Sequence, residues 1–287
     1  MIATDIPPAT VRPTVRATAG ISIVNLDTPR QQEQAADLYR TVFGYADGAT
    51  GVSPKLLRGL LENSGSALGA FDSDGRILGF CYGFSAVDNS GQQAVIYHYS
   101  QATAIAADAQ GRGVGRLLKR AQADVALRQG AATMRWAYDP YLARNAHFNL
   151  NTLGARGRWF VPDFYREPDS DRIVVEWELD EAHAAARSAD AGRRLRAVIP
   201  QIEDVVAHDA PYAVHNGQAG DERWVVFPST SNAHHHTGKA SAREALRSIV
   251  AGYFASGLVA VSCGRLHSAA RAQSDGDDRS IYIFGKD

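Results

Sequence analysis

The sequence predicts a mixed α/β fold, in which helices flank a sheet that is partly antiparallel and partly parallel. Strand-like runs at 66–72, 76–87 and 93–106 are joined by the turn sequences DSDG and DNSG, which are typical of antiparallel hairpins. The third run leads through a glycine-rich loop and a helix-patterned segment to another strand-like run at 132–138. A strand–helix–strand step of this kind makes a parallel crossover.

The part of the chain before the first hairpin predicts a strand and two helices. The run at 20–27 is strand-like. Thr-Pro-Arg-Gln at 28–31 forms a capping box with proline at the first helical position, and Ser-Pro at 53–54 repeats the start signal. Leucines at helical spacing follow that second signal. Residues 1–19 contain three prolines and no apolar signal segment, so we expect a flexible tail.

The glycine-rich loop is followed by one helix with an apolar face and then by a short helix near 144–153. Strand-like runs at 155–161 and 171–179 come next, and core packing is the expectation for Trp136, Trp159 and Trp177. An alanine- and arginine-rich stretch, helical or a linker, begins near 180. We therefore expect a main domain at 20–180 and an αβ extension at 181–287, which either stands alone or extends the first sheet.

Charge and composition indicate an ordinary globular protein. The 30 basic and 31 acidic residues leave a net charge of −1, which argues against a nucleic-acid or membrane-surface partner. No apolar run reaches the length of a membrane span. Cys81 and Cys263 lie in apolar runs and are expected to be buried free thiols in the cytoplasm. The sequence is compatible with a homodimer and does not fix the oligomeric state.

The loop before the long helix holds three glycines in five positions, Gly111, Gly113 and Gly115. Glycine lets backbone N–H groups converge, and a helix N-terminus adds unpaired donors, so the pattern predicts a site for a phosphate or pyrophosphate. Arg112, Arg116 and Lys119 are expected to add positive charge. The alternative is a tight connection without a ligand. The spacing fits neither a P-loop nor the dinucleotide fingerprint, which disfavours a nucleotide-dependent oxidoreductase.

The sequence Gln-Gly-Arg-Gly-Val-Gly at 110–115 resembles the Q/R-x-x-G-x-G/A pyrophosphate loop of the GNAT acyl-CoA N-acyltransferases. The predicted order of elements is similar to theirs, and 139–165 is similar to a subgroup of larger GNAT proteins with a C-terminal extension. The resemblance implies a splayed sheet and transfer of an acetyl or other short acyl group from acyl-CoA, without a metal, to a small-molecule amine. A non-catalytic CoA-binding protein is the alternative.

The resemblance also implies which residues hold the cofactor. The pantetheine arm would pair with the end of the strand at 105–107, and the N–H groups of 112–115 would hold the pyrophosphate. Asn145 would contact the cofactor arm, or else act only as a helix cap. The residues assigned to the cofactor are Ile105, Ala106, Ala107, Gln110, Gly111, Arg112, Gly113, Val114, Gly115, Arg116, Asn145 and Phe148.

The acid for the leaving thiolate departs from the family pattern. Many relatives have a tyrosine where this chain has Leu150. The neighbouring aromatic is Phe148, and neither side chain carries a transferable proton. Asn149, Tyr138 or Tyr165 would substitute, or the thiolate would leave with help from solvent.

The base is expected to be Asp139, at the end of its strand, or His98, on the neighbouring strand. The alternative for Asp139 is a turn former before proline, and for His98 it is packing or hydrogen bonding. The position of His147 leaves its role open. The run His234–His236 cannot wrap one metal ion, so we expect a polar loop there.

Overall fold

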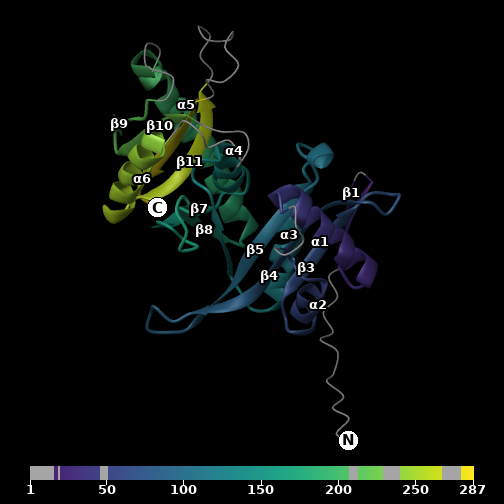
Figure 1. Ribbon diagram of the computed structural model, residues 1–287. Helices are drawn as coiled ribbons and strands as arrows, with labels where there is room; N and C mark the ends of the chain where they lie inside the picture. The colour runs from purple at the N-terminus through teal and green to yellow at the C-terminus, as the bar shows by residue number, and fades with distance from the viewer. Residues whose placement is uncertain (1–15, 19, 46–50, 207–212, 229–239, 267–278) are drawn as a thin grey trace, which may run out of the picture. The chain divides into compact units, whose positions relative to one another are not determined.

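The computed structural model describes residues 16–18, 20–45, 51–206, 213–228, 240–266 and 279–287 (Figure 1). The chain divides into two compact units, Met1–Trp136 and Ala137–Asp287, which we call unit 1 and unit 2. Each unit is a sheet with helices packed on it. In the described part of the chain, no helix is long and apolar enough to cross a membrane.

Unit 1 contains a mixed sheet with the strand order β1-β2-β3-β4-β5-β6. Neighbouring strands are antiparallel except for β5 and β6, which are parallel. The mixed α/β fold and the parallel crossover are thereby confirmed. Its elements are β1 (Arg16–Thr18), β2 (Ile21–Asn25), α1 (Pro29–Phe43), α2 (Pro54–Glu62), β3 (Ser66–Phe71), β4 (Ile77–Asp88), β5 (Val95–Ile105), the 3-10 turn η1 (Ala107–Ala109), α3 (Val114–Arg128) and β6 (Thr133–Tyr138), whose last two residues begin unit 2.

The first helix begins where its capping signal lies. Thr28 Oγ1 accepts a hydrogen bond from the N–H of Gln31 at 3.3 Å, and Gln31 Oε1 accepts one from the N–H of Thr28 at 3.0 Å. The capping box is confirmed, and α1 ends at Gly44 in the left-handed conformation. Ser53 precedes α2 without a side-chain capping bond. The short strand β1 was not predicted.

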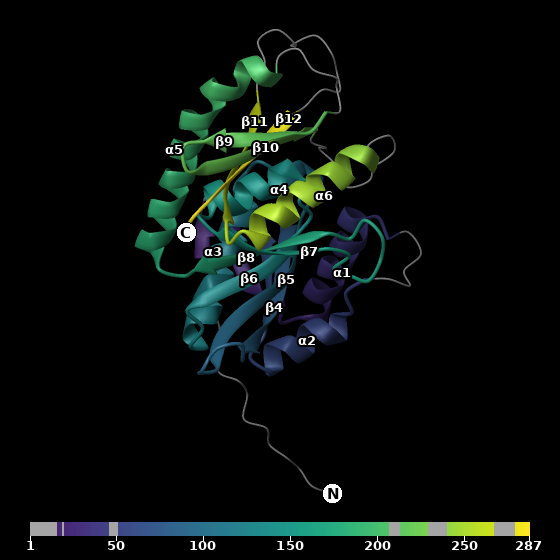
Figure 2. The same ribbon diagram turned by 90° about the vertical axis from the view of Figure 1, so that its left-hand side faces the viewer.

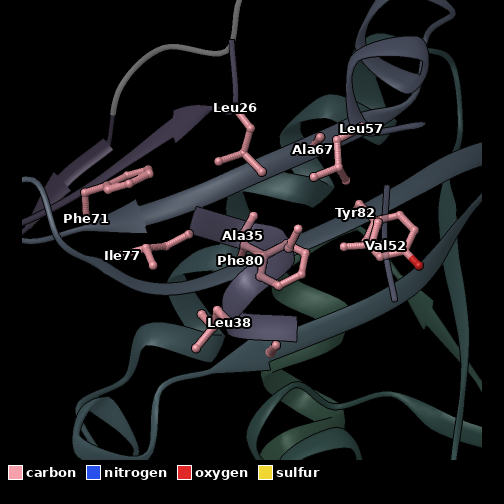
Figure 3. Packing of buried hydrophobic residues seen from close by; sticks show 12 residues of the cluster. Leu26, Ala35, Leu38, Val52, Leu57, Ala67, Phe71, Ile77, Phe80 and Tyr82 are labelled. Atoms are coloured by element: carbon pink, nitrogen blue, oxygen red, sulfur yellow. The ribbon is translucent and has the colours of Figure 1, made fainter. Parts of the chain in front are cut away.

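Helices cover both faces of the sheet of unit 1, α1 and α2 on one face and α3 on the other. Side chains of β4 alternate between the two faces, so this strand contributes to both cores. Phe80 and Tyr82 pack with Leu57 of α2 and Ala35 of α1, and Figure 3 shows these side chains gathered around Phe80. Cys81 belongs to the opposite cluster, which α3 supplies with its apolar face. Covering both faces leaves the strand ends as the place where backbone remains accessible.

Unit 2 has the strand order β8-β7-β11-β12-β10-β9, and its paired neighbours are antiparallel (Figure 2). Ala260 of β11 pairs with Gly157 of β7, so the C-terminal strands continue from the β7–β8 hairpin. Its elements are α4 (Ala143–His147), the π-helix η2 (Phe148–Thr152), β7 (Arg156–Val161), β8 (Arg172–Glu178), α5 (Glu181–Val206), β9 (His215–Ala219), β10 (Glu222–Pro228), α6 (Ala240–Ala255), β11 (Val259–Leu266) and β12 (Arg279–Gly285).

Strand β12 is buried on both sides, which explains its continuous apolar sequence. Ile281 and Ile283 join the cluster on the α5 side. The alternate residue Phe284 meets Phe254 of α6 edge to face, with ring centroids 5.6 Å apart. Figure 2 shows α5 and α6 on different sides of the β9–β12 strands.

Three expectations for unit 2 had different outcomes. The stretch after 180 is helical, one of its two expected alternatives, and forms a single helix of 26 residues with Pro200 inside it, consistent with its alanine and arginine content. The helix expected near 144–153 changes into η2, where the N–H of Leu153 bonds the carbonyl of Phe148 at 3.0 Å. Core packing was wrong for Trp159, which lies on β7 and is 41% exposed. His234–His236 lie outside the described residues, so the polar loop expected there stays a prediction.

We expect Leu57→Ala to lower the free energy of unfolding by about 3–5 kcal/mol, the usual loss when a buried leucine leaves a cavity. Leu57 is fully buried between α2 and the sheet. Urea denaturation monitored by circular dichroism measures the change. Leu56→Ala is the matched control, since Leu56 lies on the same helix but is 49% exposed. A loss for Leu57→Ala no larger than for Leu56→Ala would contradict this packing.

Candidate functional site

The glycine loop between β5 and α3 has a backbone that only glycine adopts without strain. Gly111 and Gly113 have φ angles of +79° and +80°. A Cβ atom built on either residue would meet no atom within 4 Å. The space next to these glycines is therefore open, and no close contact inside the protein explains them.

The loop presents positive charge at the start of α3. Gly113 is the N-cap of α3, and the first-turn N–H groups have no acceptor inside the helix. The side chains of Arg112 and Arg116 are exposed on the same turn. Asp108, just before the loop, accepts a hydrogen bond from Arg76 at 2.6 Å, which lowers the pKa of the Asp108 carboxyl. Because this acid already has a cationic partner, the loop suits an anionic ligand.

The end of β5 offers backbone groups on the side away from β4. The N–H of Ala106 donates to the carbonyl of Leu78 at 2.9 Å, so this N–H is not available to a ligand. Antiparallel pairs alternate between bonded and non-bonded, and Ile105, opposite Gly79, therefore turns its N–H and C=O away from β4. Ala107 begins η1. Of the three residues expected to pair with a ligand, Ile105 has the most suitable geometry.

The strands β5 and β6 pair over a very short stretch. His98 is opposite Met134 and Tyr99 is opposite Arg135, but no pair of Ser100 with Trp136 follows in the described sheet. β5 also bulges here, since Tyr82 and Gly83 of β4 are opposite Ala102 and Ser100. The parallel strands thus separate beside a bulge and ahead of the glycine loop.

This is the fold expected of a GNAT acyltransferase. The order from β2 to β8, with two helices before the antiparallel strands and the glycine loop before α3, is the order that the resemblance implies. The chain has the GNAT fold. The order of elements, the mixed sheet and the glycine loop all match it.

Solved acetyltransferases are similar to this chain at low sequence identity. Nourseothricin acetyltransferase is 17% identical over 40% of this chain and 66% of its own length, just under two thirds, with a TM-score of 0.35. An aminoglycoside 6'-N-acetyltransferase complexed with coenzyme A is 14% identical over 55% of this chain and 96% of its own, with a TM-score of 0.42. NAA60 from Arabidopsis thaliana, in complex with a bisubstrate analogue, is 10% identical over 55% and 98%, with a TM-score of 0.46. No protein-family model and no curated protein matches the sequence.

His98 lies beneath α3 with no exposed surface. Its Nε2 atom is 2.9 Å from Ser66 Oγ, and the side-chain amide of Gln122 donates to the same hydroxyl at 2.9 Å. Burial lowers the pKa of His98 to about 4, so the imidazole is neutral at pH 7. These contacts match the packing and hydrogen-bonding alternative for His98, and such a low pKa makes it a weak base.

Lys119 was expected to add positive charge to the glycine loop, and this expectation was wrong. Its side chain is buried between α3 and the sheet, where the Nζ atom donates to Ser100 Oγ at 2.7 Å. A lysine at this position of an amphipathic helix is normally read as part of the solvated face. Sequence reasoning therefore placed a buried residue at the surface.

Asp139 and Tyr138 lie at the end of β6, in unit 2. One carboxylate oxygen of Asp139 accepts the N–H of Tyr141 at 2.8 Å, and its carbonyl accepts the N–H of Leu142 at 3.2 Å. Asp139 thus forms the turn that its sequence suggests, while its second carboxylate oxygen is not used in that turn. Tyr138 is buried, and burial raises the pKa of its phenol, which makes it a weaker acid than an exposed tyrosine.

Asn145 is not a helix cap. The N-cap residue of α4 is Leu142, and the N–H of Asn145 already bonds the carbonyl of Leu142 at 2.9 Å. The side chain of Asn145 is exposed, so of its two alternatives contact with a ligand remains. Phe148 is half-buried, and Asn149 is buried.

Leu150, at the position where the resemblance implies a tyrosine, is fully buried. Tyr165 and His147, the other candidate proton carriers of unit 2, have structural contacts. Tyr165 is half-exposed, and the guanidinium of Arg172 lies 5.0 Å from its ring centroid. His147 Nδ1 is 2.8 Å from the carbonyl of Cys263, which ties α4 to β11.

Much of the family-like segment 139–165 packs against the C-terminal strands and α5. Asn151 donates to Ser262 Oγ at 2.8 Å and accepts the N–H of Cys263 at 2.9 Å. A Cβ atom on Gly154 would lie 2.2 Å from the carbonyl oxygen of Ala184 in α5, so only glycine fits there. Sequence reasoning missed these contacts because their partners are 30 or more residues away along the chain.

The buried neutral His98 predicts a loss of stability in acid. An unfolded histidine takes up a proton near pH 6.5, whereas the folded one does so only near pH 4. Between these values the unfolded state binds more protons, so stability falls as the pH falls, by up to about 3 kcal/mol in total.

Urea denaturation at several pH values between 7 and 4 measures this loss. His98→Gln, which keeps a hydrogen-bonding side chain, should remove most of the slope, whereas His183→Gln, on the surface of α5, should leave it unchanged. An equal slope in the wild type and in His98→Gln would contradict the buried neutral state.

Proposed function

We propose that this chain is an acyl-CoA-dependent N-acyltransferase that moves an acetyl or other short acyl group to the amine of a small molecule. In the reaction, the neutral amine attacks the thioester carbonyl, the C–N bond forms, the C–S bond breaks, and CoA leaves as the thiolate. The attacking nitrogen loses a proton and the thiolate gains one. In this proposal residues 20–180 form the acyltransferase domain and 181–287 the extension.

One observation supports the proposal most strongly. The exposed glycine loop, with two left-handed glycines at the N-terminus of α3 and Arg112 and Arg116 on the same turn, is suited to a pyrophosphate. It directly follows the strand end at which Ile105 turns backbone groups away from β4. A ligand that carries a pyrophosphate next to an amide-containing arm fits this sequence of sites, and CoA has this chemistry.

The residues proposed to bind CoA are those that the resemblance implies. The arm pairs with the backbone at Ile105, and the N–H groups from Arg112 to Gly115 hold the pyrophosphate. Asn145, exposed on α4, and Phe148 are proposed to contact the arm, together with the flanking residues Ala106, Ala107, Gln110 and Arg116.

The proposed chemistry assigns the base to Asp139. Its carboxylate accepts a proton from the amine, directly or through one water. His98 is the weaker candidate because it is fully buried. Tyr138 and Asn149 are proposed as hydrogen-bond donors to the thiolate, and solvent supplies its proton.

A non-catalytic CoA-binding protein is the second candidate. It is favoured by Leu150, which stands in place of the usual tyrosine and is fully buried. The two candidates differ in turnover, since only the enzyme releases free thiol from acetyl-CoA in a way that depends on an added amine. Thiol release with a panel of small primary amines separates them.

We expect Gly113→Ala to weaken CoA binding at least tenfold, a loss of about 1.4 kcal/mol. The added methyl group meets nothing within the chain, so it would lie in the space proposed for the pyrophosphate. Titration calorimetry with CoA measures the affinity.

Gly130→Ala is the matched control, because Gly130 follows the other end of α3 with a φ of +82° and has equally open surroundings. Both substitutions should lower stability by about 1–2 kcal/mol through the left-handed backbone. Only Gly113→Ala should affect CoA. Equal CoA affinities for the two variants would reject the loop as the pyrophosphate site.

We expect Asp139→Asn to lower kcat for thiol release by about 10²–10⁴ at pH 7, the usual range for general base catalysis. Asparagine keeps the side-chain oxygen that forms the turn with Tyr141 but is not basic. CoA affinity should be unchanged, and part of the rate should return at higher pH, where more of the amine is already neutral. A rate within threefold of the wild type would leave Asp139 as a turn residue only.

A further inference from the structure

A buried lysine lies where the two parallel strands of unit 1 separate. Lys119, on the inner side of α3, is 3% exposed. Its Nζ atom donates to Ser100 Oγ on β5 at 2.7 Å and lies 3.9 Å from the centroid of the Trp136 ring on β6. Lysine is almost never buried to this extent without a specific partner, because desolvation of an ammonium group is costly.

The two partners of Lys119 occupy a particular place in the sheet. The parallel ladder ends at Tyr99 and Arg135, and Ser100 and Trp136 are the next residue on each strand. One side chain therefore contacts both strands at the first position where they no longer pair. The bulge of β5, between Ser100 and Ala102, lies at the same level.

We propose that Lys119 is a positioning residue that fixes the opening between β5 and β6 for the acyl-CoA arm. This inference rests on the proposed function, because it concerns the same opening. The ammonium group holds β5 through the hydroxyl of Ser100 and β6 through the face of the indole of Trp136. These contacts set the strand separation without main-chain hydrogen bonds, so the backbone of β5 stays available to the ligand.

The surroundings of Lys119 make its charge sensitive to pH. The titratable groups that face it are Cys81 on β4 and His98 on β5, and both are neutral at pH 7. Burial without an anionic neighbour lowers the pKa of Lys119 to about 7. Below this pH the ammonium binds both partners. Above it, the neutral amine loses its attraction to the indole face, and the opening is less well defined.

The first experiment needs no ligand. Tryptophan fluorescence is measured from pH 5.5 to 9 in the wild type, Lys119→Met and Trp136→Phe. We expect the wild type to show a transition near pH 7 that is absent from both variants, since a cation over the ring perturbs the emission of Trp136. An identical transition in Lys119→Met would show that the lysine does not hold Trp136 and would overturn the inference.

The second experiment measures CoA affinity by calorimetry between pH 6 and pH 9. The wild type should lose affinity across this range by up to about tenfold, in line with the strength of a desolvated cation–π contact. Lys119→Met should bind weakly at every pH. Arg120→Met removes one exposed charge from the adjacent position of α3 and should stay within twofold of the wild type at each pH. Thermal unfolding is expected to show that Lys119→Met is at least as stable as the wild type, because a buried ammonium is replaced by an apolar side chain.

The outcomes separate the two proposals. If Lys119→Met binds CoA like the wild type while Gly113→Ala does not, the positioning role is wrong and the CoA site stands. If the wild type binds no CoA, the proposed function fails, and the role of Lys119 toward the arm fails with it. If both variants bind weakly and only Lys119→Met loses the pH dependence, both proposals are supported.

Discussion

Backbone N–H and C=O groups that leave a sheet must find other partners, and the site of this protein depends on that constraint. β5 is paired with β4 along its whole length, yet with β6 at only two positions. Because β4 still pairs with β5, the backbone groups on the other side of β5 lose their β6 partners while the strand itself is kept. The bulge of β5, the backbone groups of Ile105 that face away from β4 and the open glycine loop come one after another along the chain after this separation of the two strands.

The separation of β5 from β6 also explains why α3 is apolar on only part of the face that packs on the sheet. Val114, Leu118 and Val125 pack on the closed region of the sheet. Lys119 and Gln122, on the same helix, are also buried, but they face Ser100 and Ser66, whose hydroxyls accept their hydrogen bonds. These two buried hydrogen bonds join α3 to β5 and to β3 at fixed positions.

Local chemistry made most of the fold predictable. The capping box at Thr28, the hairpin turns and the glycine loop before α3 each depend on neighbours within a few residues, and the structure has all of them. Features that depend on distant partners were not predicted, such as the burial of Lys119 by Ser100, the contacts of Asn151 with β11 and the 26-residue α5 through Pro200. The glycine loop could be located from the sequence because its pattern lies within a few neighbouring residues. The roles of Asp139, Tyr138 and Asn149 stay predictions, because a catalytic role depends on what a side chain faces in the folded protein.

The two cysteines are both free and buried, one in each unit. Burial raises the pKa of the Cys81 thiol to about 12 and raises that of Cys263 as well, so neither is a reactive thiolate while its surroundings stay closed. A thiol reagent can then modify each cysteine only during an opening of the structure around it. The chain consequently contains one natural reporter of local opening in each unit, and the two labelling rates read the opening free energies of unit 1 and unit 2 separately.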